Sequence, residues 1–407
     1  MQDITEEEQL HRRMVDRIVE GRAEYGVPVS PEVERALRRV KRHVFVPGAP
    51  SQEAYADDAV ITKRDANGMA TSSVSQPTII AMMLDQLQVR PGDRILEIGS
   101  GGYNAALMRE LTGPDGLVVT MDIDREVTDR ASATLAAAGY DDVQVVCADG
   151  EFGCAEYAPY DRIIVTVGAA DIPPAWVEQL TAYGRLVVPL RLRGLTRSLA
   201  LDRVGDHLVS SAYEVCGFVP MQGAGSSQQR QVVLHGEPGR EVALRVDNPA
   251  LQFDAALGEA LAAPRAEVWT GVTVGSMEPF DDLDLWLAYT LAEFSLLTAT
   301  KAAVDAGLVD PTWRLGTPAI TSGGTFAYRT LRKIGDNVHE FGVFGHGPDA
   351  DAVAGRLAEQ IRVWNREHRG GRGPTFTIYP AGTPDDRLDG GLVIDRDHIR
   401  VSVSWPR

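Results

Sequence analysis

Five apolar segments separated by helical patterns run through residues 94–190, and they constrain the fold more than any other feature of the chain. The segments are rich in valine, isoleucine and leucine, as buried strands are. They lie at residues 94–98, 117–123, 143–149, 161–167 and 184–190, with helical patterns at 105–111, 125–138 and 173–182. Strands that alternate with helices in this way form a parallel sheet covered on both faces. We therefore predict an α/β fold with a doubly wound, Rossmann-like sheet.

The chain around this sheet is expected to form two domains. Residues 219–231 are rich in Gly, Ser and Gln, which indicates a boundary or a long loop. Residues 1–220 are expected to hold the parallel sheet and N-terminal helices, and residues 221–407 to form an α+β domain. The other predicted elements are helices at 6–24, 31–42, 75–87, 249–262 and 350–366, an apolar segment at 283–299, and strands at 325–335, 338–347, 374–380 and 398–405.

Charge and cysteine content disfavour several classes of function. The formal net charge of −17 over 407 residues disfavours binding to a phosphate backbone, so no nucleic-acid partner is expected. Three cysteines without ligand spacing predict neither a metal site nor a disulfide framework. No stretch approaches the roughly 20 apolar residues of a membrane span, and the acidic N-terminus does not resemble a signal peptide. A cytoplasmic location is the simplest expectation.

The segment RILEIGSGGYNAALMREL, residues 94–111, places Gly99, Gly101 and Gly102 between the first strand and its helix. Glycines at such a junction let the backbone approach a ligand closely. The dinucleotide fingerprint requires a further glycine three positions after the second, where this chain has Asn104. A strict NAD-binding interpretation therefore fails.

Three acidic residues stand at or beside the ends of successive strands and narrow the choice of ligand. Glu97 precedes the glycines, Asp122 lies at the end of the second strand, and Asp149 ends the third and is followed by Gly150. An acid at the second strand's tip can accept hydrogen bonds from both ribose hydroxyls of a nucleoside, and Asp149 is suitably placed for the edge of an adenine ring. Three acids would repel a pyrophosphate and tolerate a cation. S-adenosylmethionine, a phosphate-free nucleoside with a sulfonium, fits this description.

Residues 10–220 resemble the protein-L-isoaspartate O-methyltransferase family, which implies a class I methyltransferase sheet. The resemblance is carried by RALRRVKRHVFVP, AYADDAV, SSVSQPTIIAMML, DRILEIGSGGYNAALM, the ADG at 148–150, YDRIIVTVGAADIPPAWVEQLTAYGRLVVPL and GFVPM. One departure is a glycine loop one residue shorter between Gly101 and Tyr103. The resemblance implies cofactor contacts from Glu97, Gly99, Gly101, Asp122, Asp149 and Gly150. The predicted cofactor contacts also include Gln76, Ser100, Tyr103, Asn104, Ile123 and Thr166.

Methyl transfer to a carboxylate needs positioning more than a strong base, because the acceptor is already ionised at neutral pH. Small hydroxyl donors suit this task. Ser75 is the leading candidate for holding the acceptor carboxylate, with Ser73 beside it. Ser75 also precedes Gln76 and Pro77 and can be interpreted as a helix N-cap. The two roles are compatible, because a helix N-terminus itself attracts anions.

The long second part bears on the substrate, because typical repair enzymes resemble only the first part of this chain. This architecture and the GSGGYNAAL loop resemble a branch of the family called FxLD-system methyltransferases. The resemblance implies methylation of an aspartate in a modified, macrocyclic precursor peptide of the lanthipeptide, lasso or graspetide kind, followed by closure to a succinimide. General isoaspartyl repair, a non-catalytic cofactor-binding scaffold and a small-molecule methyltransferase are the alternatives. We expect a monomer or homodimer whose second part recognises the peptide, with a generic isoaspartyl peptide methylated without that part.

Overall fold

The largest element of the fold is a ten-stranded mixed sheet whose first five strands are parallel. The structure, a computed structural model, describes residues 5–66 and 68–406. The parallel strands lie in the order β5 (Gln144–Cys147), β4 (Leu117–Asp122), β3 (Arg94–Ile98), β6 (Tyr160–Val165) and β7 (Leu180–Leu192). The strand order reverses at β3, so the carboxyl ends of β4, β3 and β6 meet where such sheets bind ligands. The predicted doubly wound α/β sheet is confirmed.

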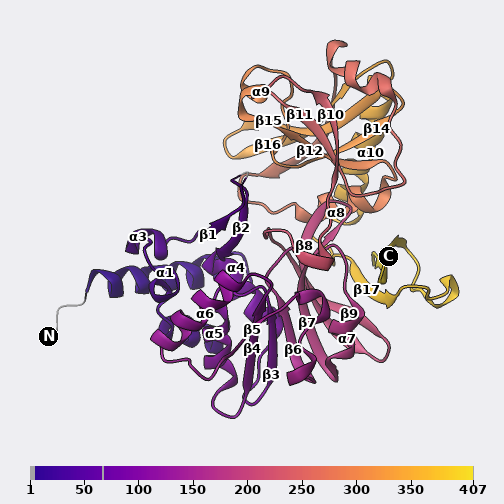
Figure 1. Ribbon diagram of the computed structural model, residues 1–407. Helices are drawn as coiled ribbons and strands as arrows, with labels where there is room; N and C mark the ends of the chain where they lie inside the picture. Colours follow the sequence, from indigo (N-terminus) through magenta and orange to yellow (C-terminus); the bar gives the residue numbers. More distant parts are fainter. Residues whose placement is uncertain (1–4, 67, 407) are drawn as a thin grey trace.

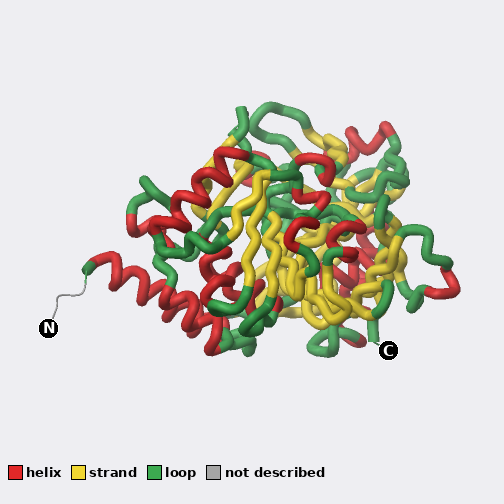
Figure 2. Tube along the Cα trace, turned by 60° about the horizontal axis from the view of Figure 1, so that its bottom comes forward, coloured by secondary structure: helices red, strands yellow, loops and turns green. Residues whose placement is uncertain are grey.

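Helices cover the parallel strands because side chains alternate between the two faces of the sheet. Ile95 and Val118 pack against the N-terminal helices, whereas Leu96 and Val119 share the opposite core with Trp176 of α7. In Figure 2 the strands run side by side with these helices next to them. No helix in the described ranges has both the length and the apolar character to cross a membrane. The helices of this part are α1 (Glu6–Glu24), α2 (Pro31–Arg39), α3 (Ser51–Ala54), α4 (Pro77–Leu87), α5 (Tyr103–Thr112), α6 (Arg125–Ala137) and α7 (Pro174–Glu178).

The C-terminal strands complete this sheet, which differs from the predicted division of the chain at residue 220. After β7 the order continues antiparallel through β8 (Leu195–Val204), β9 (His207–Val215), β17 (Thr375–Pro380), β19 (Ile399–Ser404) and β18 (Leu392–Asp395). Thr377 pairs with Val209, and Ile378 with Leu208. Figure 1 shows the yellow C-terminal segment returning beside β9. Strands β17, β18 and β19 therefore belong structurally to the ten-stranded sheet.

Seven strands between residues 230 and 346 form a second, antiparallel sheet. Helix α10 (Ala350–Glu367) packs across β12, β15 and β16, because Val353, Leu357, Ile361 and Trp364 fall on one buried face. This confirms the predicted helix. The strand order is β10 (Arg230–His235), β11 (Val242–Val246), β13 (Phe294–Ala299), β14 (Thr317–Ser322), β15 (Thr325–Gly335), β16 (Val338–His346) and β12 (Ala266–Gly275).

Three predicted elements differ from the structure. The helix predicted at 173–182 ends at Glu178, because Leu180 pairs with Tyr160 and begins the long strand β7. The apolar segment 283–299 divides into helix α8 (Asp281–Thr290) and strand β13. The helix predicted at 249–262 is a 3₁₀ helix over Ala255–Ala262, which Asp254 caps through the N–H of Ala256. A short helix, a short strand and a 3₁₀ turn can have the same pattern of apolar residues, so periodicity alone does not distinguish between them.

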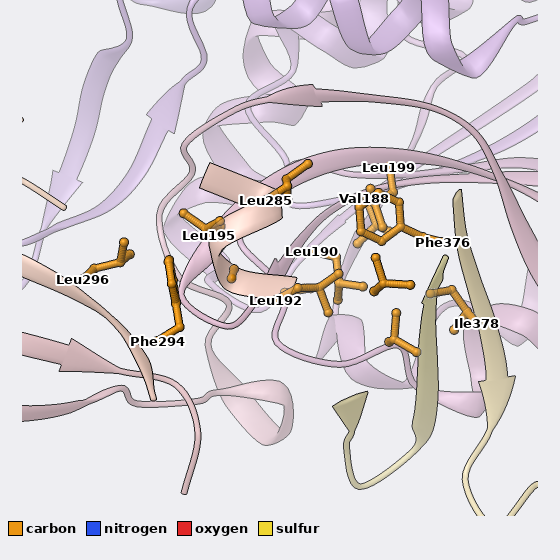
Figure 3. Close-up of a cluster of buried hydrophobic side chains, with 14 of the residues drawn as sticks. Val188, Leu190, Leu192, Leu195, Leu199, Leu285, Phe294, Leu296, Phe376 and Ile378 are labelled. Carbon is orange, nitrogen blue, oxygen red and sulfur yellow. The ribbon is translucent and has the colours of Figure 1, made fainter. Parts of the chain in front are cut away.

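The two parts share one hydrophobic core, so they are packed together rather than joined by a linker. Figure 3 shows side chains of the β7–β8 hairpin reaching toward both the second sheet and the C-terminal strand β17. A core that continues across the boundary makes each part depend on the other for stability. The labelled members of this core are Val188, Leu190, Leu192, Leu195, Leu199, Leu285, Phe294, Leu296, Phe376 and Ile378.

Candidate active site

A pocket of about 580 Å³ of empty space lies at the carboxyl ends of β3, β4 and β6. A second pocket, of about 380 Å³, adjoins it and shares Thr71, Gly99, Asp122 and Val167 with it. The first pocket, here called the methyl pocket, has two carboxylates in its lining and no lysine, arginine or histidine. It brings together ten of the predicted site residues: Ser73, Ser75, Glu97, Gly99, Ser100, Gly101, Tyr103, Asn104, Asp122 and Thr166.

The loop after β3 needs glycine for a steric reason. Gly99 has a φ of +96°, a conformation that L-residues rarely adopt. A Cβ at this position would lie 2.8 Å from Thr166 Oγ1 and 2.9 Å from a methyl group of Val167. The Thr166 hydroxyl donates a hydrogen bond to the Gly99 carbonyl. The glycine therefore allows the loop to pack closely against the end of β6 and leaves the pocket open beside it.

Glu97 is a buried carboxylate at the floor of the pocket, only 1% exposed. Its Oε1 accepts a hydrogen bond from Asn104 Nδ2 at 2.8 Å, and its Oε2 accepts one from Thr120 Oγ1 at 2.6 Å. Burial raises the pKa of Glu97 to about 7, against the lowering effect of these two donors. Among the described residues no cation lies within ion-pair distance of it, so a positively charged ligand would stabilise its ionised form.

Asn104 lies in the first turn of α5, at the position of the third glycine in a dinucleotide-binding loop. Its side chain has a specific hydrogen-bonding role there. Its amide nitrogen orients Glu97, while its Oδ1 is buried without a partner among the described residues. The Ser100 hydroxyl and the Tyr103 hydroxyl are buried and unpartnered in the same way, and all three side chains line the pocket. Buried polar atoms of this kind are costly unless a ligand or water satisfies them.

Asp122 lies at the tip of β4, where a nucleoside ribose was predicted to bind. One carboxylate oxygen accepts the Ser100 N–H at 3.2 Å, and the other accepts the Asp124 N–H at 2.9 Å. Burial raises the pKa of Asp122, although these backbone donors oppose the rise. The two acids and three unpartnered polar atoms fit S-adenosylmethionine, whose sulfonium and ammonium are positive and whose amino-acid and ribose groups donate and accept hydrogen bonds.

Ser73 and Ser75 lie on the opposite wall, at the end of strand β2 (Ala70–Val74) and just before α4. Neither hydroxyl has a hydrogen-bond partner in the part of the chain that the structure describes. The N-cap interpretation of Ser75 is wrong, because the N-cap residue of α4 is Gln76 and the first-turn N–H of Thr78 donates to Asp57 at 2.9 Å. The serine hydroxyls are therefore available to a substrate.

A buried arginine that the sequence analysis did not single out holds this wall in place. Arg42 is 0% exposed, and its guanidinium donates to the carbonyls of Val74 and Ser75, each at 3.1 Å, and of Asp58 at 3.0 Å. Five donors in a fixed fork suit a residue that must fix several carbonyls at once. Basic residues surround it in RRVKRH, so its role had no clear signal in the sequence.

Four predicted cofactor contacts lie outside the methyl pocket. Ile123 and Gly150 line the adjoining pocket. Gln76 donates its amide to Asp57 at 3.1 Å and lines neither pocket. Asp149 lines neither pocket as well, and its carboxylate accepts the N–H groups of Glu151 at 3.0 Å and Ala224 at 2.9 Å. Asp149 thereby fixes the loop that follows Gln222, and its contact with adenine stays a prediction.

Comparison with known proteins gives consistent matches over the first half of the chain. Residues 13–226 match the family described as protein-L-isoaspartate(D-aspartate) O-methyltransferase. A relative from Methanopyrus kandleri, named protein-L-isoaspartate O-methyltransferase, is 35% identical over 229 residues, which cover 56% of this chain and 99% of the relative. A relative of the same name from Methanoregula boonei is 39% identical over 213 residues, covering 52% and 92%.

One solved structure extends the likeness of fold to the second part. It is named protein-L-isoaspartate O-methyltransferase, is 20% identical, and covers 97% of this chain and 99% of its own with a TM-score of 0.50. At 20% identity, this match shows a similarity of fold alone. The likeness of fold thus extends over nearly the whole of this chain.

Proposed function

We propose a substrate for this chain, which belongs to the protein-L-isoaspartate(D-aspartate) O-methyltransferase family and is an S-adenosylmethionine-dependent carboxyl methyltransferase. The proposed substrate is an aspartate side chain within a ribosomally made, modified macrocyclic peptide. The methyl ester then closes to a succinimide, as the next backbone nitrogen attacks the ester carbonyl and methanol leaves. The cytoplasm is the proposed place of the reaction, and the enzyme is proposed to act as a monomer or homodimer.

The residues of the methyl pocket have separate tasks in this proposal. Glu97 and Asp122 would hold the cofactor, and Ser100, Tyr103 and Asn104 would satisfy its polar groups. When bound, S-adenosylmethionine supplies a methyl group on a positively charged sulfur, which a carboxylate can take by direct displacement. The chain needs no strong base for this, because the acceptor is ionised at neutral pH.

Ser73 and Ser75 orient the acceptor carboxylate in this proposal, and Arg42 keeps their backbone in position. Holding two reacting groups in line and excluding water is worth roughly 7 to 11 kcal/mol of the barrier. The hydroxyls of these two pocket-lining serines have no partner among the described residues, so they lose no internal hydrogen bond when they bind the carboxylate. This arrangement favours a positioning mechanism.

One observation favours a peptide as substrate: the methyl pocket adjoins a cleft of about 1460 Å³ that both parts of the chain form together. Phe218 lines both, and consecutive residues of α4 divide between them, Ile79 in the cleft and Ile80 in the pocket. A cleft beside the pocket can contact residues that flank the acceptor. An enzyme for one constrained peptide gains specificity from such contacts, whereas a general repair enzyme must accept many sites.

General isoaspartyl repair is the second candidate, and the names of the curated relatives favour it. The deciding experiment incubates the enzyme and S-adenosylmethionine with two synthetic peptides, one linear with an isoaspartyl residue and one lactam-cyclised with a normal aspartate in the ring. Mass spectrometry should show addition of one methyl group and then loss of methanol on the cyclised peptide only. Methylation of the isoaspartyl peptide alone would favour repair, and calorimetric binding of the cofactor without turnover of either would favour a scaffold.

A further inference from the structure

The cleft between the two parts carries more positive charge than the rest of this acidic chain would suggest. The interdomain cleft is lined by apolar side chains, among them Phe218, Phe280, Trp313 and Leu315, and by three arginines and two aspartates, which are Arg197, Arg245, Arg329, Asp281 and Asp284. Trp313 is 63% exposed and Leu315 is 49% exposed, so two large apolar side chains face solvent beside the arginines. Basic and apolar groups thus share one surface.

The three arginines of the cleft differ in how their charge is compensated. Arg329 forms an ion pair with Asp284 and lies over the ring of Phe280. Arg197, only 5% exposed, donates to the backbone carbonyls of Thr196 at 3.0 Å and Asp281 at 3.1 Å. Asp281 also lines the cleft, where burial raises the pKa of its carboxyl group and the charge of Arg197 opposes the rise.

The side chain of Arg245, on strand β11, has neither a hydrogen bond nor an ion pair with any residue that the structure describes, and the nearby charges that act on its guanidinium are those of Arg191 and Asp247. The side chain is half-buried, and its Nε is fully buried without a partner. A Cβ added at Gly316 would lie 3.1 Å from Nη2 of Arg245, so the guanidinium lies against the loop that carries Trp313 and Leu315. A desolvated guanidinium without a partner is costly.

The missing partner is most simply a carboxylate from outside the chain. The chain contains 57 aspartates and glutamates against 40 lysines and arginines, yet none of its described carboxylates pairs with Arg245. A planar guanidinium binds a carboxylate through two parallel hydrogen bonds. The exposed Trp313 and Leu315 beside it would contact an apolar neighbour of that carboxylate.

We propose that Arg245 binds a second carboxylate of the peptide substrate, next to an apolar residue, while the methylated aspartate enters the methyl pocket. This inference rests on the proposed function, because it assigns a further segment of the same peptide to the cleft. It defines the substrate class more narrowly as a peptide with an acidic and apolar segment near the acceptor. Arg245 is a specificity residue and takes no part in methyl transfer.

A binding experiment tests the cleft without requiring turnover. The probe is a fluorescein-labelled linear peptide of alternating glutamate and leucine, and its matched partner carries glutamine in place of glutamate. Fluorescence anisotropy should give the wild-type enzyme a Kd at least about tenfold lower for the glutamate peptide. Arg245→Gln should abolish this preference, Arg245→Lys should restore part of it, and high salt should weaken it. Equal binding of both peptides by the wild type would overturn the inference.

The control variant is Arg240→Gln, which removes the same charge from the exposed turn before β11, where Arg240 forms an ion pair with Glu237. It should keep the glutamate preference. Cofactor affinity and the thermal unfolding midpoint should be alike in all variants, which excludes misfolding as the cause. A preference lost equally in Arg240→Gln would show a general effect of charge and would overturn the role of Arg245.

A kinetic experiment separates this inference from the proposed function. The lactam-cyclised aspartate peptide is made with and without an appended glutamate and leucine segment. Arg245→Gln should raise KM about tenfold for the extended peptide and leave kcat, and the rate with the unextended peptide, unchanged. If the cyclised peptides are methylated but the variant has no effect on KM, the inference fails alone. If no cyclised peptide is methylated while the anisotropy preference depends on Arg245, the proposed function fails and the anion site stands.

Discussion

Replacement of Glu97 by glutamine should separate what this carboxyl group costs in folding from what it contributes to cofactor binding. Burial raises the pKa of Glu97 to about 7 from an ordinary value of 4.5. Between these pH values the folded chain binds the proton more tightly than the unfolded chain, so the free energy of unfolding falls as the pH rises through this range. Above pH 7 the cost of the ionised group amounts to roughly 3 kcal/mol.

The glutamine variant should recover most of this cost in the cofactor-free protein. Glutamine has an NH2 group in place of one of the two carboxylate oxygens, so either Asn104 or Thr120 loses its acceptor, and this loss offsets about 1 kcal/mol. We therefore expect a net gain of about 2 kcal/mol in the free energy of unfolding at pH 8 and little gain at pH 5. Binding of S-adenosylmethionine should weaken by roughly 1.5 to 3 kcal/mol, because a charge-assisted contact is lost.

Urea unfolding at pH 5 and pH 8 measures the first effect, and calorimetric titration with S-adenosylmethionine measures the second. Glu53→Gln, at an exposed position of α3 outside both pockets, is the matched control and should change neither. Wild-type affinity for the cofactor should also fall as the pH drops below about 7, and Glu97→Gln should lose this dependence. A variant that is less stable than the wild type at pH 8, or equally stabilised at both pH values, would refute the reasoning.

Three further substitutions test individual contacts. Ser75→Ala should lower kcat more than it weakens cofactor binding, because the hydroxyl faces the acceptor, and an unchanged kcat would exclude that role. Asp122→Ala should weaken cofactor binding by roughly 1 to 3 kcal/mol; a calorimetric Kd equal to that of the wild type would contradict the assignment. Gly99→Ala should destabilise the fold by roughly 1 to 3 kcal/mol, because φ is +96° and Thr166 lies too close. A urea midpoint equal to that of the wild type would contradict this expectation and would show that the loop can shift to accommodate the added methyl group.

The position of the methyl pocket could be predicted from the sequence, because several of its residues lie at or just after the ends of predicted strands. In a parallel sheet the carboxyl ends of neighbouring strands share one edge, so Glu97 and Asp122 had to lie near one another. The glycines mark the same edge. The availability of Ser75 could not be predicted, since it depends on Asp57, a residue distant in sequence, taking over the cap of α4. Contacts between segments far apart in sequence leave no local pattern.

The same limit explains what the sequence analysis missed in the rest of the chain. A buried arginine such as Arg42 has the same local neighbours as an exposed one, and only the fold shows that five carbonyls surround it. The interdomain cleft likewise arises from segments between residues 79 and 329. Strand patterns at 374–380 and 398–405 were visible, but the sheet that they join was not, because strand pairing is non-local.

The pairing of these last strands changes the expected outcome of truncation. The sequence suggested that residues 1–220 alone would methylate a generic isoaspartyl peptide. In the structure that fragment loses β17, whose Phe376 and Ile378 are about 1% and 2% exposed in the shared core, and it leaves β9 as an unpaired edge. Each lost side chain removes roughly 1.5 to 3 kcal/mol of burial, and an open apolar edge promotes aggregation.

We therefore expect the 1–220 fragment to be insoluble or to lack a cooperative unfolding transition, with no binding of S-adenosylmethionine by calorimetry. The full chain with Ile378→Ala is the milder counterpart and should lose roughly 2 to 5 kcal/mol of stability while keeping cofactor binding. The pocket itself lies wholly within residues 71–219, so loss of binding in the fragment would come from lost support and not from lost contacts. A soluble fragment that unfolds cooperatively and binds the cofactor would show that the shared core is not needed to form the site.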